Sequence, residues 1–472
     1  MMRTLILITV LMALFGLGIR ADGQALNNFN FEGDGARARG MGGAYISISD
    51  DASALTWNPA GLIQIIDPQL SFSFDLFMPN TDYSLDYPNA TSQNTSVIYD
   101  DTKFRLQYAA FAAPIRIRDH PFVGAVSFST ISSEYDYFEA NPDSGFTDPS
   151  EPVNLIERTD NRLNQLRLGF GTNVWKKLNF GLGANIYFGK GYVDTSFFYH
   201  TSYMHPTQNV LVNVDAKGFV YDTISFSGFN LVGGLLWDDE RFAIGATVKT
   251  PFWLTQEHVK HELDSVYVNN VLNGELVRGD IDEQDKERVE VPWMVGVGAS
   301  YQVDERFLVA SDFEWRRLGV MDYRVHYDTI LSNGDVEENF VESNLNLYNG
   351  YTIRVGGEYE FDGGFATIPV RAGFAYDAFG FRMIENLEFE WVDWADDQPD
   401  SLTQTFDYGD QITGYTISLG AGLHWELIKL DFAFEYDTRD TDIEGVDHFG
   451  TFQVAKEYRT PRISLNFTGF FK

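Results

Sequence analysis

The sequence predicts an all-β protein, a 14-stranded antiparallel transmembrane β-barrel plugged by a small N-terminal segment. Three observations support this fold class. Apolar and polar side chains alternate from about Pro68 onward, which is typical of strands with one apolar face. Short and long connections alternate along the chain, as in outer-membrane barrels. The N-terminus resembles a secretory signal.

Composition excludes several other classes. The 472 residues carry 34 Lys plus Arg and 68 Asp plus Glu, a formal charge of −34, which excludes a nucleic-acid binder that neutralises phosphates. Aromatic residues make up 15% of the chain, unlike in disordered acidic chains. No apolar run of about 18 residues follows the N-terminus, so a helical membrane protein is excluded. The chain has no Cys, which excludes thiolate chemistry.

The first 25 residues are expected to be a signal peptide. Arg3 supplies a charged start, and the apolar stretch from Thr4 to Ile19 is short for a membrane span. Gly23 and Ala25 give a small-x-small cleavage pattern. An uncleaved anchor helix is the alternative. We expect three parts: the signal 1–25, a plug 26–66 and a barrel 67–472.

Each expected strand has one apolar face. In residues 430–436, Leu430, Phe432 and Phe434 alternate with polar or small residues. Fourteen such strands are expected, an even number. They begin near Pro68, Lys103, Pro121, Asn161, Leu178, Lys217, Arg241, Glu290, Arg306, Leu347, Ala366, Gln411, Lys429 and Pro461.

The connections between these strands predict how the barrel is oriented. Tight turns are expected around residues 119–120, 176–177, 238–239, 304–305, 362–364 and 427–428, with long loops between them. All short turns then lie at one end, the periplasmic end of outer-membrane barrels. Because an open sheet edge cannot face hydrocarbon, the last strand, Arg462 to Phe471, must pair with the first. Inward glycines leave room in the lumen.

Acidic residues concentrate in the expected long loops. Residues 380–410 hold nine acids and one base, and residues 255–289 hold nine acids and four bases. A solvated acidic surface is the simplest interpretation. The segment from Asp440 to Gly445 also resembles the start of a calcium loop, with Asp440, Asp442 and Glu444 as oxygen ligands. Its twelfth position is Thr451 instead of Glu. No other cofactor is expected.

One set of residues could support catalysis. His424 shares the lumen face of a strand with Ser418 and Glu426, which would fit a membrane hydrolase with a general base. A polar lumen wall needs such residues anyway, and no phosphate-binding glycine loop is present. We therefore expect no enzyme.

Residues 26–66 do not have the pattern of a barrel strand. Glycines are frequent there, and Ala52 to Leu55 predicts the start of a short helix that Asp50 or Asp51 caps and that ends before Pro59. Some 40 residues cannot form a core of their own. We expect this segment to fill the barrel lumen.

The same segment carries the motifs of a known family. Gly35-Ala36-Arg37-Ala38, Gly42-Gly43, Asp50-Asp51-Ala52 and Asn58-Pro59-Ala60 follow one another along it. In these motifs the chain resembles the N-terminal hatch of FadL-type (OmpP1/FadL/TodX) outer-membrane transporters of long-chain fatty acids and aromatic hydrocarbons. The count of 14 strands is also the barrel size of this family. A secretion-associated branch of outer-membrane barrels shares a similar opening, so a scaffold for protein secretion is the alternative function.

The resemblance implies uptake of a hydrophobic ligand by hatch-gated passive diffusion through a monomer in the outer membrane, in contact with its lipid and with no nucleic-acid partner. The hatch motif, Asp50, Asp51, Asn58, Pro59 and Ala60, would hold the shape of the plug. Four hatch aromatics would lie near the ligand: Phe29, Phe31, Tyr45 and Trp57. An outer capture surface would lie on two long loops, residues 199–216 and 255–289. Its members would be Tyr199, Tyr203, Met204, Leu211, Leu263, Val266, Tyr267 and Leu272.

Overall fold

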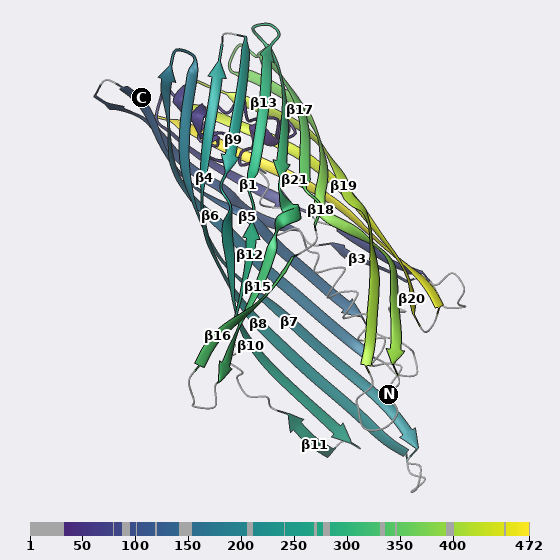
Figure 1. Cartoon of the computed structure of the whole chain (residues 1–472). Helices are drawn as coiled ribbons and strands as arrows, with labels where there is room; N and C mark the ends of the chain where they lie inside the picture. The colour runs from purple at the N-terminus through teal and green to yellow at the C-terminus, as the bar shows by residue number, and fades with distance from the viewer. Residues whose placement is uncertain are drawn as a thin grey trace.

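The structure is a computed structural model (Figure 1). It describes residues 33–78, 80–86, 95–100, 102–118, 120–140, 153–204, 211–239, 241–268, 271–276, 284–330, 336–344, 347–392, 401–447 and 450–471. Within these ranges, no helix has the length and apolar character needed to cross a membrane. The expected signal peptide, residues 1–25, lies outside the described residues, as do Phe29 and Phe31.

The strands of the described residues form one 21-segment sheet. Six barrel strands are each made of two segments: β1 (Gln69–Phe77) with β2 (Asn80–Asp86), β3 (Thr95–Asp100) with β4 (Lys103–Ile117), β9 (Phe242–Lys249) with β10 (Phe252–Val268), β12 (Gln284–Val291) with β13 (Met294–Gln302), β14 (Phe307–Arg316) with β15 (Asp322–Ile330), and β16 (Val336–Asn344) with β17 (Gly350–Asp362). Eight are single: β5 (His120–Ala140), β6 (Val153–Trp175), β7 (Leu178–Met204), β8 (Leu211–Asp238), β18 (Thr367–Val392), β19 (Ser401–His424), β20 (Ile428–Asp447) and β21 (Gly450–Phe470). The short β11 (Val271–Leu276) pairs with β10.

The sheet closes on itself as an antiparallel barrel. β21 pairs with β1, from Gln69 opposite Phe470 to Phe77 opposite Arg462, so the expected pairing of the last and first strands is confirmed. Together with the segment joins above, this closure confirms the fourteen expected strands among the described residues.

The expected long loops are shorter than the sequence indicated. Strands that follow a tight turn begin where expected, such as β5 at His120 and β7 at Leu178. Strands that follow a long connection begin earlier: β19 begins at Ser401 instead of near Gln411, and β21 at Gly450 instead of near Pro461. The acidic residues 380–410 are therefore mostly strand, and so are residues 255–289. Beyond the lipid-facing band no apolar face is needed, so the period-two pattern ends before the strand does.

The outer wall of the barrel is apolar and the inner wall polar. On β21 the side chain of Leu465 is 51% exposed, whereas Ser464 is 0% exposed. On β19 the side chain of Ile417 is likewise exposed, whereas that of Ser418 is buried. Outward apolar residues with inward polar ones are the pattern of a lipid-facing barrel wall.

Residues 33–66, here called the N-terminal segment, lie inside the barrel. They form α3 (Ala36–Gly40), α4 (Ala54–Trp57) and the 3₁₀ helix η2 (Pro59–Gln64). α3 contacts β18 to β21, and η2 contacts β5 to β8, so the segment reaches both walls. Figure 1 shows it in purple within the upper part of the barrel, near the C-terminus.

Glycines on the inner wall make room for this segment. A Cβ on Gly373 of β18 would clash with the backbone of Gly42, and a Cβ on Gly245 of β9 would lie 2.5 Å from the carbonyl oxygen of Ile46. Backbone therefore meets backbone where other side chains would block the approach. The expectation that inward glycines leave room in the lumen is confirmed at these positions.

Candidate functional site

Asn58 joins the N-terminal segment to the barrel wall. Its side-chain oxygen accepts a hydrogen bond from the Ala60 amide at 3.1 Å, which caps η2, and Pro59 occupies the first turn. Its Nδ2 donates to the carbonyl oxygens of Ile46 and of Leu235 on β8, each at 3.0 Å. One buried amide thus fixes two parts of the segment and one wall strand.

The two motif aspartates lie on one side of Tyr45. Asp51 accepts hydrogen bonds from the Ser53 amide at 2.8 Å and from the Tyr45 hydroxyl at 3.1 Å. Asp50 forms an ion pair with Arg37 at 2.5 Å. Burial raises the pKa of the Asp51 carboxyl, and the charge of Asp50 raises it further, while the bonds from Ser53 act the other way. These contacts join the motif residues to other parts of the segment, and their role in holding its shape stays a prediction.

Buried ion pairs join the segment to both walls. Asp34 accepts from Arg167 of β6 at 2.6 Å, and Arg39 donates to Glu435 of β20 at 2.7 Å. Arg37 also contacts Glu358 of β17. A buried pair that loses one partner leaves an uncompensated charge, so these contacts resist separation of the segment from the wall.

An apolar cluster covers the lumen wall beside the N-terminal segment. Tyr45 and Trp57, both fully buried, pack edge to face with ring centroids 5.9 Å apart. Across from them Tyr187 of β7 and Phe252 of β10 stack with ring centroids 4.6 Å apart. The wall side of this cluster also contains Leu163, Leu254, Val291 and Met294. Apolar walls of this kind are typical of sites for hydrophobic ligands.

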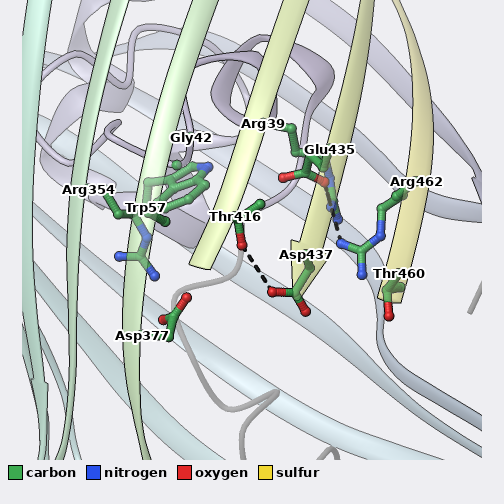
Figure 2. A pocket seen from close by; sticks show the side chains of 13 residues that line it. Arg39, Gly42, Trp57, Arg354, Asp377, Thr416, Glu435, Asp437, Thr460 and Arg462 are labelled. Carbon is green, nitrogen blue, oxygen red and sulfur yellow. Dashed lines mark hydrogen bonds and ion pairs between the residues drawn. The ribbon is translucent and has the colours of Figure 1, made fainter. Parts of the chain in front are cut away.

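A small polar cavity lies beside Trp57. Its volume is about 70 Å³, and Trp57, which lines it, also belongs to the apolar cluster. Figure 2 shows Arg39, Glu435 and Arg462 on one side of it and Arg354 on the other. Its charged side chains are three bases and three acids: Arg39, Arg354, Arg462, Asp377, Glu435 and Asp437. A volume of this size is enough for roughly two waters.

The wall has a weak point between β4 and β5. Their pairing ends at Tyr108 opposite Ser129, although β4 continues to Lys103 and β5 to Ala140. The register of β5 also shifts between Thr130 and Ser132. Such a bulge bends a strand and ends pairing.

The residues of the expected capture surface lie on neighbouring strands that extend beyond the lipid-facing band, so their expected loop placement is wrong. Tyr199 on β7 is opposite Ala216 of β8, and Ala216 is opposite Val266 of β10. Met204 is opposite Leu211. The remaining members are on the same three strands or on β11: Tyr203, Leu263, Tyr267 and Leu272. The backbone therefore brings the two expected halves of this surface together, and its role stays a prediction.

The expected calcium loop is a strand. Asp440, Asp442 and Glu444 belong to β20, which pairs with β21 from Ile428 to Asp447. Asp440 forms an ion pair with Arg459 at 2.5 Å. The turn that calcium loops use is therefore absent at residues 440–444, and calcium binding by these carboxylates stays a prediction.

The residues weighed for hydrolysis do not form a nucleophile and base. The nitrogen Nε2 of His424 lies 2.9 Å from Asp431 of β20, and the Ser418 hydroxyl donates to the carbonyl oxygen of Gly40 at 3.3 Å. Ser418 is 1% exposed under the N-terminal segment. Both side chains are thus engaged in contacts that hold the wall and the segment.

The ion-pair partners of the N-terminal segment and the apolar wall beside it could not be predicted from the sequence. Arg37 belongs to the motif Gly35-Ala36-Arg37-Ala38 and Arg39 directly follows it, but nothing in the sequence shows which wall acids they meet. Tyr187 and Phe252 are 65 positions apart and come together only through strand pairing. Inward apolar residues on otherwise polar faces were the available signal for the wall.

Comparison with known proteins identifies relatives of this chain. A family model described as outer membrane protein transport protein (OMPP1/FadL/TodX) matches residues 13–382. Solved structures of similar fold include a FadL homologue of Pseudomonas aeruginosa, with 15% identity, a TM-score of 0.61, and coverage of 93% of this chain and 99% of that one. The toluene transporter TodX of P. putida has 14% identity, a TM-score of 0.55 and coverage of 94% and 99%. The toluene transporter TbuX of Ralstonia pickettii has 15% identity, a TM-score of 0.51, and coverage of 94% of this chain and 100% of that one. No curated protein matches the chain.

Proposed function

Because this chain belongs to the outer membrane protein transport family (OMPP1/FadL/TodX), whose barrels lie in the outer membrane, we propose that it takes up long-chain fatty acids or similar hydrophobic molecules by passive diffusion. The observation that carries the proposal is the apolar cluster beside the N-terminal segment. Tyr187, Phe252 and Met294 supply its wall, and Tyr45 and Trp57 supply the segment side. Burying an alkyl chain there gains about 0.8 kcal/mol per methylene.

The N-terminal segment acts as the gate in this proposal. Tyr45 and Trp57 are 0% and 1% exposed, so a ligand reaches them only when the segment moves. A ligand that binds the displaced arrangement better shifts the equilibrium toward it. The released ligand would leave through the wall where β4 and β5 stop pairing, at Tyr108 and Ser129.

The proposal assigns the chain no catalytic role and treats it as a monomer. The hydrogen bonds of Ser418 and His424 described above support the first part. The pairing of β1 with β21 supports the second, because one chain closes the whole sheet.

Ligand retention tests the proposal. Protein extracted in mild detergent is incubated with hexadecanoate or with an alkylbenzene and weighed by native mass spectrometry. We expect a bound ligand that Tyr187→Ala and Phe252→Ala weaken by about tenfold each, because each removes a large apolar contact worth about 1.5–3 kcal/mol. Phe229→Ala on β8, where the side chain is 54% exposed on the outer wall, is the matched control and should change nothing.

Two results would count against this proposal. Equal retention by the lining variants and the control would place the ligand elsewhere. Extraction of the chain with large protein partners and no retained ligand would instead favour the secretion scaffold.

A further inference from the structure

The barrel wall divides into two arms at one level. β13, β14, β17 and the first part of β18 pair without interruption up to Met294 opposite Arg316 and Tyr351 opposite Ala378. Beyond this level β15 pairs with β12 and β16, whereas β18 from Arg382 onward pairs with β19. In the part of the chain that the structure describes, β16 and β18 share no backbone pairing. Figure 1 shows β15 and β16 diverging from β18 and β20.

This division starts where the lipid-facing band ends. Below it the outer wall carries exposed apolar residues such as Val297 and Val355. At the level itself stand two exposed aromatics, Trp293 at 44% and Tyr348 at 38%, as expected for a membrane interface. Open strand edges cannot lie in hydrocarbon, so the arms part at the headgroup level. The tight turns lie at the other end, which makes this the outer leaflet.

An apolar contact closes the base of the division. The 3₁₀ helix η4 (Leu318–Val320) connects β14 to β15, and Leu318 is 2% exposed. Leu318 packs against Gly380 of β18, where an ideal Cβ would lie 2.6 Å from its Cδ1. Val289 and Met321 complete the buried cluster on the η4 side. The contact between η4 and β18 at this point therefore consists of the Leu318 side chain packed against Gly380.

Few hydrogen bonds reinforce this contact. The Tyr348 amide donates to the carbonyl oxygen of Gly380 at 2.8 Å. Asn349 accepts at both of its oxygens, from the Gly319 amide at 3.1 Å and from Gln411 Nε2 at 2.9 Å. Neighbouring strands in most of the described wall are joined by a ladder of backbone hydrogen bonds, the end of the β4–β5 pairing being another exception. This seam, defined as the contact of η4 with Gly380, therefore needs fewer bonds broken to open than a paired part of the wall.

The seam adjoins the lumen beside the N-terminal segment. Ala375 and Asp377, on β18 a few residues before Gly380, line the cavity next to Trp57. A molecule that passes the seam therefore arrives beside Trp57. By contrast, an anionic molecule that approaches from water meets the acidic extension, with nine acids and one base in residues 380–410.

We propose that the seam between Leu318 of η4 and Gly380 of β18 is a lateral entry for single-chain amphipathic molecules dissolved in the outer leaflet. This inference rests on the proposed function and adds its entry route. The alkyl chain enters first, because the seam is apolar and Val320, 39% exposed, marks its outer side. Entry from the membrane also bypasses the acidic extension.

A disulfide across the seam tests this route. The chain has no native Cys, so Leu318→Cys with Gly380→Cys gives a single defined pair. An ideal Cβ on Gly380 lies 3.2 Å from Leu318 Cβ, near the separation of about 3.5–4.5 Å that a disulfide spans. The matched control is Leu423→Cys with Leu430→Cys, which are opposite each other near the tight-turn end of β19 and β20. Uptake of radiolabelled hexadecanoate is measured in Gram-negative cells that lack their own fatty-acid transporter.

The oxidised seam variant should take up hexadecanoate at least fivefold more slowly than the same cells after reduction, while the control pair is insensitive to reductant. A shift in gel mobility between unheated and heated samples checks that both variants form folded barrels. Uptake equal in both redox states overturns the lateral entry. Absence of uptake by the unaltered chain would refute the proposed function, a separate outcome.

Discussion

Arg37 of the N-terminal segment donates two hydrogen bonds to Glu358 of β17, at 3.0 Å from Nε to Oε2 and at 2.8 Å from Nη2 to Oε1. Glu358 also accepts from Arg371 of β18, which in turn contacts Asp431 of β20. A planar guanidinium facing a carboxylate with two bonds is the strongest form of ion pair in proteins. The segment is thus tied by charge to three wall strands.

Removing Arg37 should loosen this tie. In Arg37→Ala, Glu358 and Asp50 lose a shared cationic partner. Glu358 keeps Arg371 and Asp50 is partly exposed, so we expect a cost of about 1.5–3 kcal/mol, the worth of hydrogen bonds to charged groups. We expect higher single-channel conductance in planar bilayers as the segment leaves the lumen more often. Arg162→Ala, which removes an exposed pair with Asp160, is the control and should leave conductance unchanged. Equal conductance of both variants would show that the Arg37 pair does not hold the segment.

Loss of the Asn58 side chain should free the region around η2. Asn58→Ala removes three hydrogen bonds, to Ala60, Ile46 and Leu235, and we expect a loss of about 1–3 kcal/mol. Limited proteolysis should then cleave near residues 58–66 while the strands stay intact. Asn173→Ala, at the end of β6 beside a tight turn and away from the N-terminal segment, serves as the comparison. A protected segment in Asn58→Ala would contradict its anchoring role.

An inner-wall glycine, Gly373, and an outward-facing one, Gly233, offer a pair of substitutions. Gly373→Ala places a methyl group against the backbone of Gly42, whereas Gly233→Ala meets nothing closer than 3.7 Å. We expect Gly373→Ala to displace the N-terminal segment and expose Trp57, seen as a red shift of its fluorescence against a Trp57→Phe blank. Gly233→Ala should leave the spectrum as it was. Matching spectra for both would mean that the wall tolerates the added methyl.

Lys249 should separate the two ligand classes. It is 7% exposed, lies opposite Met294 in the sheet and so borders the apolar cluster. An ammonium group there favours a carboxylate head, so Lys249→Met should weaken hexadecanoate binding about tenfold or more, since hydrogen bonds to charged groups are worth about 1.5–3 kcal/mol. Titration by isothermal calorimetry should show no loss for an alkylbenzene. A parallel loss for both ligands would indicate a packing effect instead.

Much of the barrel could be predicted because side-chain alternation and tight turns can be recognised in short stretches of sequence. The lipid-facing band demands alternation, and tight turns interrupt it, so β5 and β7 begin where the sequence indicates. Beyond the band nothing demands apolar residues, and the early start of β19 left no pattern to detect. The strand form of Asp440 to Glu444 was missed for the same reason.

The site could be predicted only in part because its partners are distant in sequence. The motif indicated a shaped segment, and Asp50, Asp51 and Asn58 all make contacts within it. Arg37 and Glu358 are separated by 321 positions, and no local pattern reports which acid meets which base. The seam at Leu318 likewise depends on interruptions in four barrel strands, β9 with β10, β12 with β13, β14 with β15, and β16 with β17. These interruptions are far apart in the sequence.

The central claim is that a hydrophobic molecule crosses this barrel when the N-terminal segment moves. A tether tests it directly, since an ideal Cβ on Gly171 of β6 lies 3.0 Å from Leu62 Cβ of η2. Hexadecanoate uptake is measured in cells that carry Leu62→Cys with Gly171→Cys, before and after reduction. We expect uptake close to that of the unaltered chain when the pair is reduced and loss of uptake when it is oxidised. Unchanged uptake with a quantitatively formed disulfide would contradict the claim.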